Sequence, residues 1–237
     1  IIRTLSAKWG GHNKNDCSIN IMYFFDSNSI EPKFEQYWSK NKIFFDARNY
    51  KSALNQITGV LSVIASINKS SSKFFEKTGH HDPLMLPVVF ENDSNFDPTS
   101  QLIPGAPTAI YHKSPQYIGN VVKAVYDVLH NDFYRYYSPF QADQIVERYE
   151  SDKTTKSLLS IPLLAPFEVT SDYFNCTIDE PIGVLNIYCN NENFLNGNHE
   201  VFIKFLTPFL PIIASSVLFS LGKFFTDEGD ESDESDA

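Results

Sequence analysis

Three cysteines, Cys17, Cys176 and Cys189, carry the side chains best suited to covalent chemistry. So sparse and odd a set is not the framework of a disulfide-stapled secreted domain, and it favours a reduced, cytoplasmic protein. Nucleophilic catalysis needs a base beside the nucleophile, and acid–base catalysis needs paired carboxylates in a cleft. Neither occurs here as a sequence motif. We therefore expect a binding protein with buried thiols, and no enzyme.

A metal site is suggested by His80-His81-Asp82 alone. Adjacent side chains on an extended segment point apart, and no second cluster at ligand spacing accompanies this one. We expect a solvated loop there and no bound metal. Three histidines that stand alone in the sequence are expected at the surface, namely His112, His130 and His199.

Polar side chains on predicted strands are the candidates for a binding pocket. Along residues 183–189, Val184, Asn186 and Tyr188 share one face because strand side chains alternate. A buried Asn186 must be satisfied either by a ligand or by neighbouring protein groups, and both interpretations stay open. Candidates of the same kind are Ser160, Tyr111, Tyr117 and Asn120.

Charge separates a body from a tail. Seven of the 29 acidic residues fall in residues 227–237, which leaves 22 acidic and 19 basic residues in 1–226. The tail has no apolar residue before Ala237, so it cannot offset its ordering entropy and we expect it to be disordered. The body is near-neutral and lacks a run of Lys or Arg that could line phosphates. Nucleic acid is therefore not an expected partner.

No segment is expected to span a membrane. The nearest apolar stretch, residues 205–221, is interrupted by Pro208, Pro211 and a serine pair. Because the first residue is Ile rather than Met, we take the chain to be part of a longer protein, in which an upstream anchor could tether a cytoplasmic domain.

The scaffold that must position these residues is predicted to be α/β, of the α+β type. An apolar fraction of 42% is enough for a sizeable core. Strand-like composition predicts strands over 18–26, 84–91, 157–164 and 182–189, with 84–91 at an edge because of Pro87. Apolar residues at three-to-four spacing predict helices over 50–67, 140–150 and 199–221, with a short one over 106–111. Residues 118–128 stay unassigned, and 92–107 is the longest predicted loop.

The sequence also predicts the N-caps of two helices and a kink in the last one. Ser138, followed by Pro139, is predicted to cap the helix over 140–150, and Asn198 the helix that follows it. Pro208 or Pro211 is expected to kink that last helix.

Four segments between residues 104 and 187 follow one another in a characteristic order. They are Pro104-Gly-Ala-Pro-Thr-Ala-Ile-Tyr-His-Lys-Ser-Pro-Gln-Tyr-Ile118, the helix over 140–150, Lys156-Ser-Leu-Leu-Ser-Ile-Pro-Leu163 and Pro181-Ile-Gly-Val-Leu-Asn-Ile187, with a closing helix after them. In this order they resemble a GAF domain, over residues 104–221. The resemblance implies an antiparallel sheet with helices on both faces, and one sensory domain over 1–226 with an enlarged N-terminal part.

The resemblance also implies a function. A small molecule of unknown identity would bind beneath a lid formed by residues 104–150, and the domain would relay the signal to an associated output domain. The implied ligand contacts are Tyr111, Tyr117, Asn120, Ser160, Asn186 and Tyr188. The alternative is a GAF-like domain with a filled core, used for dimerisation or for holding a partner protein.

This sequence departs from the residue patterns of two functional groups within the GAF family. Cyclic-nucleotide-binding members carry a Lys–Asp pair, and here Asn191 stands in the Lys position and Asn198-His199 in the Asp-Glu position, so the pair cannot form. GAF-like methionine sulfoxide reductases use cysteines close to the substrate. Cys176 and Cys189 lie on the hairpin that would border the pocket, which keeps a thiol enzyme as a remote alternative.

The last predicted helix carries more apolar surface than one sheet can cover. In proteins that resemble GAF sensors, the same helix of a second copy commonly covers the excess, together with a helix near the start of the domain. The expected homodimer interface contains Phe202, Phe205, Phe209 and Ile213. The alternative is that residues 31–75 fold back over this helix within one chain.

Overall fold

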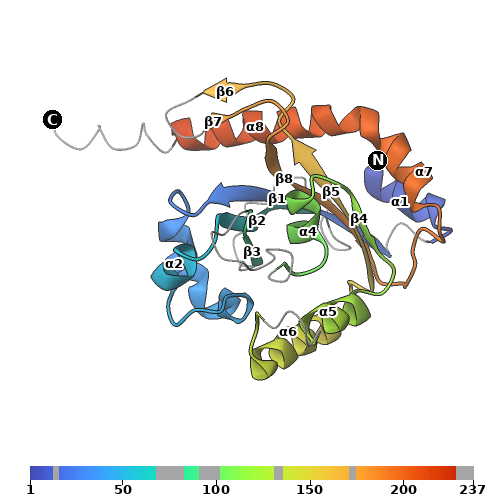
Figure 1. Ribbon diagram of the computed structural model, residues 1–237. Coiled ribbons are helices and arrows are strands. Elements are labelled where there is room, and N and C mark those ends of the chain that lie inside the picture. Colours follow the sequence, from blue (N-terminus) through green and yellow to red (C-terminus); the bar gives the residue numbers. More distant parts are fainter. Residues whose placement is uncertain (13–15, 68–82, 91–101, 131–135, 171–174, 228–237) are drawn as a thin grey trace.

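A six-stranded antiparallel sheet organises the chain in a computed structural model, which describes residues 1–12, 16–67, 83–90, 102–130, 136–170 and 175–227 (Figure 1). The strand order is β3-β2-β1-β8-β5-β4. The central pair joins β1 (Cys17–Asp26) to β8 (Pro181–Cys189), from opposite ends of the sequence. The mixed α/β class is therefore confirmed, whereas the specifically GAF arrangement stays a prediction.

Residues 50–67, predicted as one amphipathic helix, form two different elements. A single helical segment, α3 (Tyr50–Leu54), is followed by strand β2 (Gly59–Ile67), which pairs with β1 and β3. The prediction was wrong because β2 is rich in β-branched residues and enters the sheet with Val60 and Leu61 both fully buried. A strand buried on both faces has no alternation of apolar and polar residues to distinguish it from a helix.

The other predicted strands are confirmed. β3 (Met85–Val88) lies at one edge of the sheet, where Pro87 is tolerated. The other edge is β4 (Gln116–Ile118), a strand that was not predicted. β5 (Ser157–Leu164) pairs with β8 along its whole length. The connection between them carries a small second sheet of β6 (Val169–Thr170) and β7 (Asn175–Cys176).

One face of the sheet is covered by the two ends of the described chain. These are α1 (Ile2–Trp9) and the run α7 (His199–Leu206), η3 (Thr207–Phe209) and α8 (Leu210–Asp227). Figure 1 shows α8 lying across the sheet, with α1 beside α7. The Trp9 ring lies 5.5 Å from the rings of both Phe202 and Phe205, which joins α1 to α7. The break predicted near Pro208 is confirmed as the 3-10 turn η3.

The opposite face is covered by the middle of the chain. Its elements are α2 (Glu31–Asn41), η1 (Lys42–Phe44), α3, α4 (Ala106–Tyr111), α5 (Val121–Leu129) and α6 (Pro139–Ser151). Phe34, Phe44 and Met22 anchor the core on this side. Because α2, η1 and α3 pack here, the described part of residues 31–75 does not cover α8 on the other face (Figure 1).

Helix boundaries follow local capping chemistry. The Ser138 hydroxyl accepts a hydrogen bond from the Gln141 amide and caps α6, as predicted. α5, over the unassigned stretch, begins at Asn120, whose side chain accepts from the Lys123 amide. Asn198 holds the N-cap position of α7 without a side-chain hydrogen bond. The predicted acidic tail, apart from Asp227 at the end of α8, lies outside the described residues.

The last helical run is long and strongly apolar. The 22 residues His199–Ser220 contain an 18-residue window with a mean hydropathy of 1.9, of which 28% is buried, so by length and composition alone this helix could cross a membrane. Phe202, Leu206 and Val217 point inward and pack on the sheet. The α-helix is interrupted at Pro208 by the single 3-10 turn η3 and resumes at once as α8, so the apolar stretch stays helical throughout.

Candidate functional site

Polar side chains cross the centre of the sheet on the face covered by α2 to α6. Asn20, Asn186 and Ser160 are direct register partners on β1, β8 and β5. The Ser160 hydroxyl donates to Asn186 Oδ1 at 2.6 Å, and Asn186 Nδ2 donates to Asn20 Oδ1 at 2.8 Å. Ser160 is fully buried and Asn186 nearly so. Neighbouring side chains thus satisfy Asn186 within the chain, one of the two interpretations left open by the sequence.

The other proposed ligand contacts are spread over separate places. Tyr188 shares the face of Asn186, opposite Ser18 and Leu158, and burial raises the pKa of its hydroxyl. Tyr117 lies on the opposite face, where its ring stacks on His199 at 4.5 Å and packs near Phe194.

Asn120 and Tyr111 lie away from that polar row as well. Asn120 caps α5 and donates a hydrogen bond to Glu192. Both residues line a hollow of about 450 Å³, together with Tyr126 and Lys153. Tyr111, at the end of α4, stacks on Phe90. The structure therefore brings Asn186 and Ser160 together and leaves Tyr111, Tyr117 and Asn120 in other environments.

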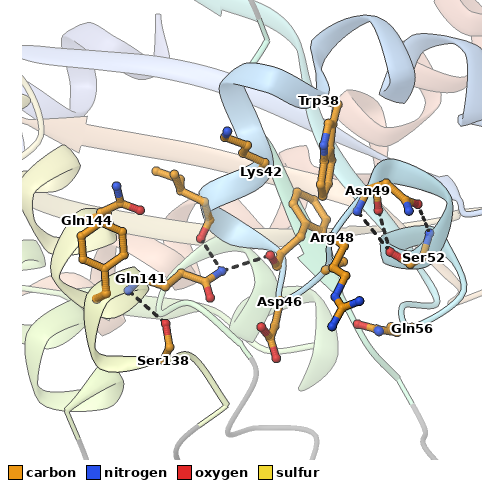
Figure 2. A pocket seen from close by; sticks show the side chains of 14 residues that line it. Trp38, Lys42, Asp46, Arg48, Asn49, Ser52, Gln56, Ser138, Gln141 and Gln144 are labelled. Carbon is orange, nitrogen blue, oxygen red and sulfur yellow. Dashed lines mark hydrogen bonds between the residues drawn. The ribbon is translucent and has the colours of Figure 1, made fainter.

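A larger hollow of about 670 Å³ opens between η1, α3 and the start of α6 (Figure 2). We call it the α6 groove. It is lined by Trp38, Lys42, Ile43, Phe45, Asp46, Ala47, Arg48, Asn49, Ser52, Gln56, Ser138, Phe140, Gln141 and Gln144. Part of its wall comes from the predicted lid, but most comes from residues 38–56, where the sequence analysis proposed no site. The signal that was available there was the cluster Asp46-Ala-Arg48-Asn49 between two apolar runs.

One residue fixes the shape of the α6 groove. The Gln141 amide donates to the backbone carbonyls of both Ile43 and Phe45, each at 3.0 Å, and so ties α6 to the segment after α2 (Figure 2). Three other polar side chains of the groove make no such structural hydrogen bonds. Lys42, Arg48 and Gln144 are exposed and make no side-chain hydrogen bond or ion pair with another described residue. They are available to a ligand or to solvent.

An exposed apolar stripe runs along the outer side of α7, η3 and α8. We call it the outer seam. Its members and their exposed fractions are Val201 56%, Phe205 38%, Phe209 47%, Ile212 64% and Phe219 70%. Two of the four predicted interface residues, Phe205 and Phe209, belong to it. Phe202 is fully buried in its own chain and Ile213 is half-buried against the same core, so these two face the sheet.

The two cysteines of the remote enzyme alternative, Cys176 and Cys189, lie on different strands. Cys176 lies on β7, beyond the start of β8, whereas Cys189 ends β8 and is paired with Cys17 of β1. All three thiols are free and buried, as predicted. No group of three or more His, Cys, Asp or Glu side chains that could hold a metal occurs among the described residues, and His80-His81-Asp82 lies outside them.

No protein-family model, curated protein or solved structure matches this chain. The GAF resemblance therefore stays an interpretation of the sequence order.

Proposed function

We propose that this chain is a GAF-like interaction module that pairs with a second copy of itself through the outer seam. The observation that carries the proposal is the spacing of the exposed residues. Val201, Phe205, Phe209, Ile212 and Phe219 follow one another at intervals of four, four, three and seven, with Ser216 between the last two. Intervals of three and four keep side chains on one side of a helix, and from Phe209 through Ile212 and Ser216 to Phe219 they alternate, which is the pattern by which helices pack on helices.

The polar groups beside the outer seam also suit a buried interface. The hydroxyls of Ser215, Ser216 and Ser220 each donate, at 2.8 Å, to the carbonyl four residues earlier. A hydroxyl that is satisfied within its own helix can be covered by a partner without leaving an unpaired donor. Serine is also small, which lets a second helix approach closely.

Charge argues for a protein partner over a lipid surface. Helices that lie on membranes usually carry Lys and Arg on their polar face. Here Lys204 is the one basic side chain between His199 and Ser220, and the residues after 226 are strongly acidic. Anionic headgroups would be repelled by that tail. A second copy offers a matching apolar line without anionic headgroups.

Light scattering at tens of micromolar tests the proposal. The single chain has a mass of 27.0 kDa, and we expect twice that value. Phe209→Glu should return the mass to one chain, because a carboxylate would be buried in the apolar contact. Phe140→Glu is the matched control, since Phe140 is 72% exposed but lies on α6, across the sheet. A monomeric wild type, or binding to phosphatidylcholine vesicles that Phe209→Glu abolishes, contradicts the proposal.

The α6 groove supports a second function, the sensing of a small molecule. The supporting observation is its volume of about 670 Å³, within the range of known ligand pockets. Its lining also includes the Trp38 ring and the side chains of Lys42, Arg48 and Gln144, which have no hydrogen-bond or ion-pair partner among the described residues. Native mass spectrometry of the purified protein should detect a bound compound. Gln144→Trp, which narrows the groove, should reduce its occupancy, whereas Glu147→Trp on the same helix but outside the groove should not. An empty wild-type protein counts against this function.

A further inference from the structure

Two of the buried thiols are in direct contact. Cys17 is the first residue of β1 and Cys189 the last of β8, and they are register partners at the end of the central strand pair. Their sulfur atoms lie 3.3 Å apart, with the Cys17 thiol donating to Cys189 Sγ. The next pair outward is hydrogen-bonded, since the Asn190 amide donates to the Asp16 carbonyl. Cys17 and Cys189 thus form a non-hydrogen-bonded pair, in which opposed side chains come closest.

The surroundings make the two sulfurs unequal. The Cys17 thiol and the backbone amide of Asn191 donate to Cys189, and His12 adds a favourable charge interaction. These contacts outweigh burial and lower the pKa of Cys189 to about 6. The pKa of Cys17 is raised, because its thiol proton is held by Cys189, because it is buried and because Asp16 lies near it. We take Cys189 as the thiolate of the pair, since each donor points to it.

We propose that Cys17 and Cys189 form a reversible oxidation site that takes a hydroperoxide as its substrate and closes a disulfide between β1 and β8. The Cys189 thiolate attacks the peroxide, so that an S–O bond forms, the O–O bond breaks and the alcohol or water leaves after protonation. Cys189 is then a sulfenic acid. The Cys17 sulfur attacks it, the S–S bond forms and the S–O bond breaks, and the Cys17 proton leaves with the hydroxide as water. Two thiols are oxidised and one peroxide is reduced.

The position of the pair permits this reaction. Both side chains are fully buried, but they lie near the end of the strand pair, with only the Asp16–Asn190 hydrogen bond beyond them, and the ends of a sheet open locally more easily than its centre. A hydroperoxide as small as hydrogen peroxide needs little more space than a water molecule. Directly opposed cysteines on antiparallel strands also have Cα atoms near the separation that a disulfide requires. The proposal does not depend on dimerisation or on the α6 groove.

The test is to treat the native wild-type protein with hydrogen peroxide at pH 7, unfold it in an alkylating reagent and record the intact mass. The number of alkylated thiols should fall from three to one, and the peptides that contain Cys17 and Cys189 should be joined. Treatment with a dithiol should restore three. Cys176→Ser is the control, and it should lose both of its remaining thiols in the same way.

Single variants separate the two sulfurs. In Cys17→Ser, Cys189 should be trapped as a sulfenic acid by a dimedone reagent, and in Cys189→Ser, Cys17 should stay reduced at the same peroxide concentration. Circular dichroism confirms that each variant is folded. Three unreacted thiols in the wild type, a crosslink that contains Cys176, or equal oxidation of Cys17 in Cys189→Ser would overturn the proposal. The wild-type measurement decides the question even where a variant fails to fold.

Discussion

Asn186 accepts a 2.6 Å hydrogen bond from the hydroxyl of Ser160, the residue directly opposite it on the neighbouring strand. Both side chains are buried between the sheet and the helices that cover it. Ser160→Ala would leave the Asn186 carbonyl oxygen without this donor in a place that water does not reach. We expect a loss of about 1–3 kcal/mol in the free energy of unfolding, measured in urea. Ser220→Ala, at an exposed hydroxyl, should change it by less than about 0.5 kcal/mol. Equal values for the two variants would show that the buried bond contributes nothing.

Gly10 and Gly11 are neighbours that require glycine for two different reasons, lack of space for a side chain and a left-handed backbone conformation. Gly10 has an ordinary φ of −82°, but a Cβ there would overlap the backbone oxygen of Phe194. Gly11 has a φ of +73°, with open space around a Cβ. We expect Gly11→Ala to cost about 1 kcal/mol of stability through backbone strain alone. Gly10→Ala should cost clearly more, because the loop at Phe194 must move away from α1. A thermal melt in which Gly11→Ala is the worse variant would contradict this prediction.

Asn41 holds the edge strand β3 in place. Its side-chain amide donates to the carbonyls of Tyr37 and Pro83, and its oxygen accepts from the Met85 amide. Asn41 is almost fully buried. We expect Asn41→Ala to lower the free energy of unfolding by about 2–3 kcal/mol, since the Met85 amide loses its acceptor. Asn41→Asp should cost at least as much, because a buried carboxylate would face two carbonyls. Urea unfolding of both variants checks the prediction, and wild-type stability of either contradicts it.

The pKa of Cys189 predicts how its reaction with hydrogen peroxide depends on pH. Below about pH 6 the sulfur is a protonated thiol and poorly nucleophilic, and above it the thiolate predominates. The groups that act on it are Cys17, Asn191 and His12. We therefore expect the rate of disulfide formation to rise with pH and to level off above about pH 7. The measurement is quenched alkylation of the peroxide-treated protein over pH 5–9. A midpoint near that of an ordinary thiol, about 8.5, would show that Cys189 is not activated.

Much of the fold could be predicted from local sequence, and the exceptions have a physical cause. β1, β5, β8 and α6 have clear strand or helix composition with turn or cap residues at their ends. β2 was missed because residues 59–62 are buried on both faces and show no alternation, and its Val and Ile residues also fit a helical spacing. The placement of α2 and α3 across the sheet from α8 depends on packing over long sequence separations, which no local pattern contains.

The candidate sites were less predictable. Asn186 was recognised as needing a partner, and Ser160 as similar in kind, but Asn20 was not, because it lies 166 positions away in the sequence. The contact between Cys17 and Cys189 was not predicted for the same reason, since these residues are 172 positions apart in the sequence. The α6 groove joins side chains that are exposed and ordinary when taken singly, so composition gives little sign of it. For Asn20 and for the two cysteines the missing information was the strand pairing, and for the α6 groove it was the packing of α6 against residues 42–56.

The pairing of β1 with β8 also has a consequence for the synthesis of the chain. Cys17 and Cys189 are neighbours in the sheet but 172 positions apart in the sequence. A chain that emerges from the ribosome can pair β1 with β2 early, yet the other edge of β1 stays open until β8 has been made. An unpaired edge is a template for wrong association. Nascent chains that stop before residue 181 would therefore expose one side of what becomes the centre of the sheet, and they are the forms most in need of a chaperone.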